Sequence, residues 1–137
     1  MTAHPLTAFV GRDGIILLTL QGNVGETELP QLKQDLQDAA VLIRTESEKA
    51  LRPLPVLMDV SKLDRAYSSE GIMLLAEFEK NNRPYVTKTA VFGSDIKIKF
   101  TGEIISALSG RQNISFHETE EDAIASLRTD SAPSDAA

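Results

Sequence analysis

The sequence has no cysteine and no tryptophan, and its aromatic residues are only five phenylalanines and two tyrosines. Without cysteine the chain forms neither a disulfide nor a thiolate metal site, and it has no thiol nucleophile. The few aromatic side chains offer little for stacking on bases, and a net charge of −6 leaves no basic face for phosphates. We therefore expect no nucleic-acid partner. The lack of cysteine also fits a reducing compartment, so we expect a cytoplasmic protein.

Long hydrophobic runs are lacking as well. No apolar run approaches the about 20 residues that a membrane-spanning helix needs, so we expect no membrane span. The first ten residues, MTAHPLTAFV, lack the basic region and long apolar core of a signal peptide. A length of 137 residues, 42% hydrophobic and 25% charged, predicts one domain with one sheet and its helices. We place this domain at residues 1–128 and predict that the small, polar residues 129–137 form a disordered tail.

The rest of the pattern alternates short apolar runs with amphipathic stretches. Apolar runs predict strands, and apolar residues at helical spacing predict helices. The predicted strands lie at residues 6–10, 15–20, 56–60, 87–93 and 113–117. The predicted helices begin at caps near Thr27, Ser68 or Ser69, Ser94 or Asp95, and Thr119. The first helix is expected to run to about Ala50, where prolines follow. The third helix is expected to end at Gly110, and its inner face is expected to comprise Ile98, Thr101, Ile104, Ile105 and Leu108.

The order of these elements is β-β-α-β-α-β-α-β-α. Strands that are separated by helices imply crossovers and a parallel sheet. Asp13-Gly14 between the first two strands indicates a tight turn, which makes that pair antiparallel. We therefore predict an α/β fold with a single, mostly parallel sheet of about five strands, an antiparallel edge strand and four helices.

The stretch 55–82 (PVLMDVSKLDRAYSSEGIMLLAEFEKNN) is the centre of this pattern. It reads as a strand buried on both faces, a polar connection and an amphipathic helix. Asp59 is the single charge of the strand and lies near its carboxyl end, and Ser68 and Ser69 stand where a helix cap belongs. In an open parallel sheet, ligands bind at the carboxyl ends of the strands. This strand end is therefore the first candidate site.

These residues resemble the STAS family, whose founding members are anti-sigma-factor antagonists such as SpoIIAA. The family has Asp-Leu-Ser at a strand end and Asp-Ser-Ser-Gly at the following helix start. The counterparts are residues 59–61 (DVS) and 67–71 (YSSEG), with Tyr67 in place of the acidic residue and Glu70 inserted before the glycine. Residues 82–86, 108–111 and 117–123 are similar to a SpoIIAA-like branch of the family. The resemblance covers residues 6–128.

The resemblance implies a non-enzymatic regulatory domain that docks a protein partner, a kinase or another regulator, through the 68–78 helix. In the family, phosphorylation of the serine at this place breaks the complex with the kinase partner, and Ser69 is the closer counterpart. The branch is also related to CRAL-TRIO lipid-binding domains. The alternative function is therefore a small-molecule or lipid-binding module with an apolar pocket between helices and sheet. We expect Met73, Phe92 and Phe100 to line such a pocket.

Each candidate site also has a purely structural interpretation. Ser68 and Ser69 are phosphorylation candidates because a helix N-terminus favours added negative charge, yet an ordinary N-cap explains both residues. Asp59 and Ser61 are binding candidates, but such an aspartate usually accepts hydrogen bonds from loop amides and holds the turn. We favour that role for Asp59, because one carboxylate without a partner is no catalytic constellation.

Positively charged residues near the start of the helix that follows the predicted strand 87–93 form a further candidate site. Lys97 and Lys99 oppose the helix dipole there, so together with Lys88 and Arg111 they could receive an anionic ligand or an acidic partner. The alternative is that both lysines simply extend into water.

The remaining expectations concern exposed apolar groups and the chemistry that is missing. Tyr67, Tyr85 and Met73 are predicted to form an exposed apolar rim by the central helix. His117 by itself makes neither a metal site nor a catalytic triad, so we assign no catalytic residue, metal or cofactor. The long helix 29–50 and the edge hairpin could each pair with a second copy, which would give a homodimer.

Overall fold

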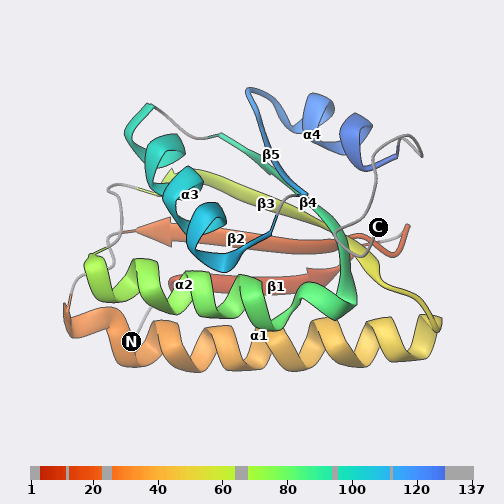
Figure 1. Cartoon of the computed structure of the whole chain (residues 1–137), viewed down its shortest axis with the longest axis horizontal. Coiled ribbons are helices and arrows are strands. Elements are labelled where there is room, and N and C mark those ends of the chain that lie inside the picture. The colour runs from red at the N-terminus through yellow and green to blue at the C-terminus, as the bar shows by residue number, and fades with distance from the viewer. Residues whose placement is uncertain are drawn as a thin grey trace.

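The chain alternates strands and helices in the order that the sequence predicts (Figure 1). The computed structural model describes residues 4–11, 13–22, 26–63, 68–93, 96–111 and 113–128. The strands are β1 (Leu6–Val10), β2 (Ile16–Gly22), β3 (Leu54–Leu63), β4 (Val86–Phe92) and β5 (Ile114–His117). The α-helices are α1 (Leu29–Ala50), α2 (Ser69–Asn81), α3 (Ile96–Ser109) and α4 (Glu120–Leu127).

The five strands form one sheet in the order β1-β2-β3-β4-β5. The β1 strand lies at the edge and runs antiparallel to β2, while the pairs β2–β3, β3–β4 and β4–β5 are parallel. Each helix between two parallel strands returns the chain to the same end of the sheet, which is why those pairs are parallel. The predicted α/β fold, with a mostly parallel sheet and an antiparallel edge strand, is confirmed.

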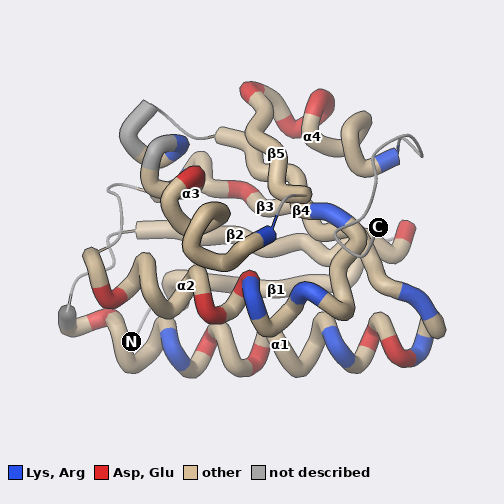
Figure 2. Tube along the Cα trace, viewed as in Figure 1, with Lys and Arg blue, Asp and Glu red and all other residues tan. Residues whose placement is uncertain are grey.

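The helices cover the two faces of the sheet unequally. The larger core packs α1, α2 and α3 against one face, and its members include Ile16, Leu36 and Leu75. The smaller core packs α4 against the opposite face through Ala123 and Leu127. Alternate residues of β3 enter both cores, as expected of a strand that is covered on both sides. Residues of both charges alternate with uncharged ones along α1 (Figure 2).

Most of the predicted helix ends are correct. The Ser68 Oγ atom accepts a hydrogen bond from the Gly71 N–H over 3.2 Å, and Thr119 Oγ1 accepts one from Asp122 N–H over 3.1 Å. Gly110 follows α3 directly. The predicted cap at Ser94 or Asp95 and the predicted tail 129–137 lie outside the described residues.

Two local predictions are wrong, and a third holds only in part. Thr27 does not cap α1: it lies in a 3₁₀ turn, its hydroxyl donates to Glu28 Oε2 over 2.6 Å, and Glu28 is the N-cap residue. Ser61 belongs to β3 and not to the connection, because β2 pairs with β3 as far as Leu63. The expected inner face of α3 holds only in part. Its Leu108 side chain is 53% exposed.

The carboxyl end of α1 shows how the helix stops before the prolines. Leu51 has a φ of 57°, in the left-handed region, and its N–H bonds to the Glu48 carbonyl oxygen over 3.2 Å. Glycine is the usual residue in this position, because a Cβ atom is strained there. The Leu51 side chain is 91% exposed, so contacts with the core do not offset this strain.

We predict that Leu51→Gly stabilises the protein by about 0.5–1 kcal/mol, because it relieves the left-handed strain at a small entropic cost in the unfolded chain. Leu51→Ala is the matched control, since it removes the same exposed side chain and keeps the strain. Urea denaturation measures both free energies of unfolding. Equal values for the two variants would show that Leu51 is not strained.

Candidate functional site

The carboxyl end of β3 is held by a hydrogen-bonded pair. The Asp59 Oδ1 atom accepts a hydrogen bond from the Ser61 N–H over 2.8 Å and one from the Ser61 hydroxyl over 2.6 Å. This is the bonding of a carboxylate that shapes the backbone after it. The structure therefore brings these two candidate residues together, in the structural role that the sequence favours for Asp59.

Gly93, the residue directly after β4, lies very close to Ser61. Gly93 has a φ of +88°, and a Cβ atom built on it would lie 2.6 Å from Ser61 Cβ and 2.8 Å from Ser61 N. Only glycine fits this close approach without a shift of the backbone. Gly93 therefore sets the distance between the ends of β3 and β4. The sequence shows Gly93 only as the last residue of a strand, and nothing in that pattern marks the contact.

The two serines at the start of α2 differ in their surroundings. Ser68 is half-buried and its hydroxyl is used as the N-cap of the helix. Ser69 is the first residue of α2 and is exposed, as is Glu70. Met73 follows one turn later and is 59% exposed. The cap therefore accounts for Ser68 but not for Ser69, and an exposed apolar side chain lies on the same side of the helix as Ser69.

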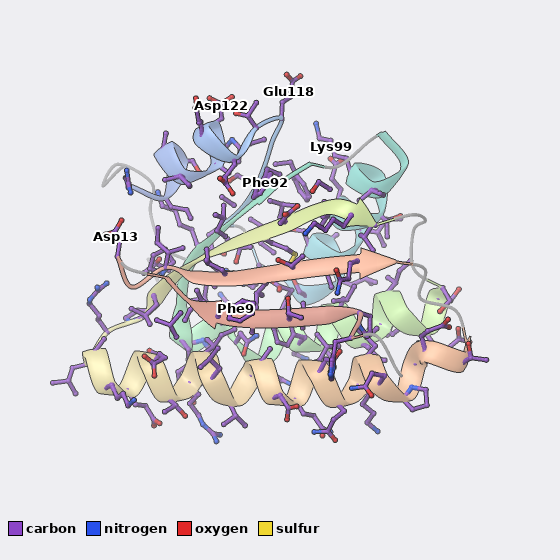
Figure 3. The ribbon with its side chains drawn as sticks, turned by 180° about the vertical axis from the view of Figure 1, so that it is seen from behind. Phe9, Asp13, Phe92, Lys99, Glu118 and Asp122 are labelled. Atoms are coloured by element: carbon purple, nitrogen blue, oxygen red, sulfur yellow. The ribbon has the colours of Figure 1, made fainter. Side chains whose placement is uncertain are left out.

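Two of the four cations of the predicted cluster, Lys88 and Arg111, take part in other contacts. Lys99 is exposed on α3 and its side chain projects outward (Figure 3), while the side chain of Lys97 lies outside the described residues. The ammonium group of Lys88 donates to the Ser126 carbonyl oxygen, which ties β4 to α4. Arg111 is buried and ion-paired with Glu79. Two of the four predicted cations are therefore engaged elsewhere in the fold.

The predicted apolar rim is also incomplete. Of its three members Met73 is exposed, but Tyr85 is half-buried and packs against the larger core. Tyr67 lies outside the described residues. On the edge strand β1, where Figure 3 labels Phe9, the Phe9 side chain is 62% and the Val10 side chain 43% exposed. A homodimer through this edge stays a prediction.

A buried ion pair lies between α2 and the start of β5, and sequence reasoning missed it. The Arg111 Nη1 atom donates to Glu79 Oε2 over 2.8 Å, and the two side chains are 1% and 7% exposed. Arg111 also donates from Nε and Nη2 to Asn113 Oδ1, over 3.0 and 2.7 Å. Burial raises the pKa of the Glu79 carboxyl above its ordinary value, and the charge of Arg111 partly opposes that effect. The available signal was the position of Glu79, four residues after Leu75 on the buried face of α2.

An apolar cavity of about 60 Å³ lies between α2, α3 and the sheet. Its walls include Leu75 and Glu79 from α2, Ile98 and Ile105 from α3, and Thr89 and Val91 from β4. A pocket between helices and sheet is what the alternative function requires, but two of the three residues predicted to line it, Met73 and Phe92, do not. Met73 faces solvent and Phe92 belongs to the core on the opposite face, while the side chain of Phe100 lies outside the described residues.

The described residues contain neither a cluster of metal ligands nor a membrane-spanning helix. No group of three or more histidine, cysteine, aspartate or glutamate residues in that part of the chain is arranged to hold a metal ion. His117 is bonded locally, with its Nε2 atom 2.8 Å from Ser115 Oγ. No helix in the described part of the chain is long and apolar enough to cross a membrane.

Comparison with known proteins identifies the fold. No family model matches the sequence, and no curated protein matches it. An uncharacterized protein of Shewanella loihica with a SpoIIAA-like fold superposes with a TM-score of 0.66, at 14% identity over 93% of this chain and 97% of that one. An anti-sigma factor antagonist of Mycobacterium paratuberculosis superposes with a TM-score of 0.61, at 18% identity over 93% of this chain and 98% of that one. The chain therefore has the SpoIIAA-like fold, as the resemblance predicts.

We predict that Gly93→Ala lowers the free energy of unfolding by about 2–4 kcal/mol, because the new methyl group combines left-handed strain with a clash against Ser61. Gly22→Ala is the matched control. Its φ is +74° and no described atom lies within 4 Å of the added Cβ, so only the strain of about 1–2 kcal/mol remains. Urea denaturation distinguishes the two, and an equal loss in both variants would contradict a close contact at Gly93.

Proposed function

We propose that this chain is a non-enzymatic regulatory domain of the STAS type, which docks a protein partner through the first two turns of α2. The observation that carries the proposal is the exposed pair Ser69 and Met73 beside the carboxyl ends of the parallel strands. Ligands of open parallel sheets bind at this edge. Exposed methionine is enriched in protein interfaces, because its flexible, polarisable side chain adapts to a partner.

The neighbouring helix also presents apolar side chains to solvent. The α3 helix packs beside α2 (Figure 1), and its Ile104 and Leu108 side chains are 37% and 53% exposed. Two adjacent helices that each present apolar side chains to solvent offer more area than a single methionine. We call Ser69, Met73, Ile104 and Leu108 the docking residues.

The expected partner is a protein of the anti-sigma-factor class. This expectation comes from the solved structure named as an anti-sigma factor antagonist, which shares the fold over 93% of this chain. The proposal contains no catalytic step, and it gives Asp59 a structural role, in which its Oδ1 atom accepts two hydrogen bonds from Ser61. A regulatory domain needs only a binding surface and a modification that changes the affinity of that surface for the partner.

We propose that phosphorylation of Ser69 is the modification that controls partner binding. The Ser68 hydroxyl is used as the cap of α2, whereas Ser69 is exposed to a kinase. A phosphate carries about −1.5 to −2 charges at neutral pH and is favoured at a helix N-terminus, so the modified helix is stable. The same charge, one turn from Met73, must be desolvated when a partner covers that residue. The modified protein should therefore bind its partner more weakly.

We predict that Met73→Glu weakens partner binding at least about tenfold, because it places a charge at the centre of the docking residues. Val41→Glu is the matched control: Val41 is 53% exposed on α1, against 59% for Met73. Isothermal titration calorimetry with the anti-sigma factors of the source organism measures both affinities. Binding by none of them, or equal losses in both variants, would contradict the proposed surface.

We also predict that kinase treatment places phosphate on Ser69 and releases the partner. Ser69→Ala should bind the partner as the unmodified protein does and should keep it after kinase treatment. Mass spectrometry locates the phosphate, and co-elution in gel filtration reports the complex. Phosphate on Ser68 instead, or a Ser69→Asp variant that binds like the unmodified protein, would rule out this switch while leaving the docking surface in place.

A further inference from the structure

The cavity between α2, α3 and the sheet is enclosed almost wholly by aliphatic and aromatic side chains. They come from both helices and from four strands and include Leu20, Leu63, Leu75, Val91, Ile98 and Phe116. The enclosed volume of about 60 Å³ is several times the roughly 10–15 Å³ that one water molecule needs. The cavity is therefore large enough for a very small molecule or for part of a larger one.

The polar side chains in this lining are not available to an occupant. The Glu79 carboxylate accepts a hydrogen bond from Arg111 over 2.8 Å, and Thr101 has an interaction partner of its own. The hydroxyl oxygen of Thr89 is buried within the wall, and this residue is only 2% exposed. A water molecule held in a cavity needs about two to four polar partners, and a polar group of a ligand that finds none loses its hydrogen bonds to water. The part of an occupant that this cavity encloses is therefore hydrocarbon.

The cavity is partly open to solvent, and the burial of its lining residues indicates the open side. All lining residues from β2, β4 and α2 are buried, whereas all those from α3 and β5 are half-buried. Strand β5 is the last strand of the sheet, so the space beside it is not closed by a further strand among the described residues. The cavity therefore opens between α3 and β5.

An aromatic ring lies at this opening, against a glycine of α3. Gly102 is in the interior of the helix, where glycine is less favourable than alanine. A Cβ atom on Gly102 would lie 2.7 Å from Cε1 and 3.0 Å from Cζ of the Phe116 ring. The close packing of that ring on α3 therefore explains the glycine, and it gives the opening an apolar rim.

We propose that this cavity binds the unsubstituted end of an aliphatic chain, which enters between α3 and β5. An apolar cavity of about 150 Å³ stays dry and binds benzene or xenon, so the volume of about 60 Å³ accommodates the last few carbon atoms of such a chain. Removal of these carbon atoms from water drives the binding. A chain that carries a polar group keeps that group outside the opening. This site is separate from the docking of a protein on the exposed side of α2.

Pentane and hexyl glucoside are the probes, and NMR follows the methyl signals of the lining residues Leu75, Val91 and Ile105 during each titration. Saturable shifts with pentane are expected, and their absence overturns the site. The ring signals of Phe116 should shift in the same titration, and a ring that does not respond overturns entry between α3 and β5. Binding of hexyl glucoside as well identifies the tail of an amphiphile as the natural type of occupant, whereas binding of pentane alone identifies a free hydrocarbon.

A hydroxyl group at the chain end tests the chemistry of the enclosed part. The probe 1,5-pentanediol has the same chain as pentane but carries a hydroxyl at each end, so neither end can enter the cavity without losing its hydrogen bonds to water. Its affinity is expected to be at least about tenfold lower than that of pentane. Equal affinity for the two probes overturns the assignment of an unsubstituted chain.

A variant that fills the cavity tests the place of binding. Val91→Ile adds one methyl group to a lining residue, so it should bind pentane about tenfold more weakly and should melt no lower than the unmodified protein. Val56→Ile is the matched control, because Val56 is 2% exposed in the larger core and does not line the cavity. That variant should melt at a lower temperature, since a closely packed core does not accept an added methyl group without strain. A Val91→Ile variant that keeps full pentane affinity, or that loses as much stability as Val56→Ile, overturns the site.

Discussion

Strand β3 lies in the middle of the sheet and is buried on both of its faces, and the positions of the other elements depend on it. Its Val56 and Met58 side chains enter the larger core and Leu57 enters the smaller one. Because side chains alternate along a strand, a shift of one residue would exchange these faces and expose apolar groups to the wrong core. The pairing of β3 with β2 and β4 is therefore strongly determined. The same pairing therefore determines where the carboxyl end of β3 lies, at the contact between Ser61 and Gly93.

The α2 helix follows from this end and has two functionally different sides. Its buried side carries Leu75 into the larger core and Glu79 into the ion pair with Arg111. Its exposed side carries Ser69 and Met73 beside the strand ends. One helix of 13 residues thus borders both the proposed protein-docking surface and the apolar cavity.

The sequence was sufficient for the order of elements, the antiparallel edge and the cap at Ser68, because these features depend on local periodicity, turn chemistry and capping. It was not sufficient for contacts between distant segments. The Glu79–Arg111 pair joins residues 32 positions apart, and the contact of Gly93 with Ser61 depends on how two strands end side by side. The cavity was expected from a family relation, but its walls could not be named, since the faces of α3 follow from tertiary packing. Apolar spacing predicted Leu108 to face inward, and it is exposed.

The central claim is that the start of α2 is a surface for a protein partner, and hydrogen exchange of the amides tests it most directly. Exchange is compared between the free protein and its complex with an anti-sigma factor of the source organism, at a concentration that saturates binding. The account predicts slower exchange at residues 69–77 and in the exposed part of α3, with α1 and β1 unchanged. Protection that falls on the exposed edge strand β1 instead, with α2 unchanged in the complex, would contradict it.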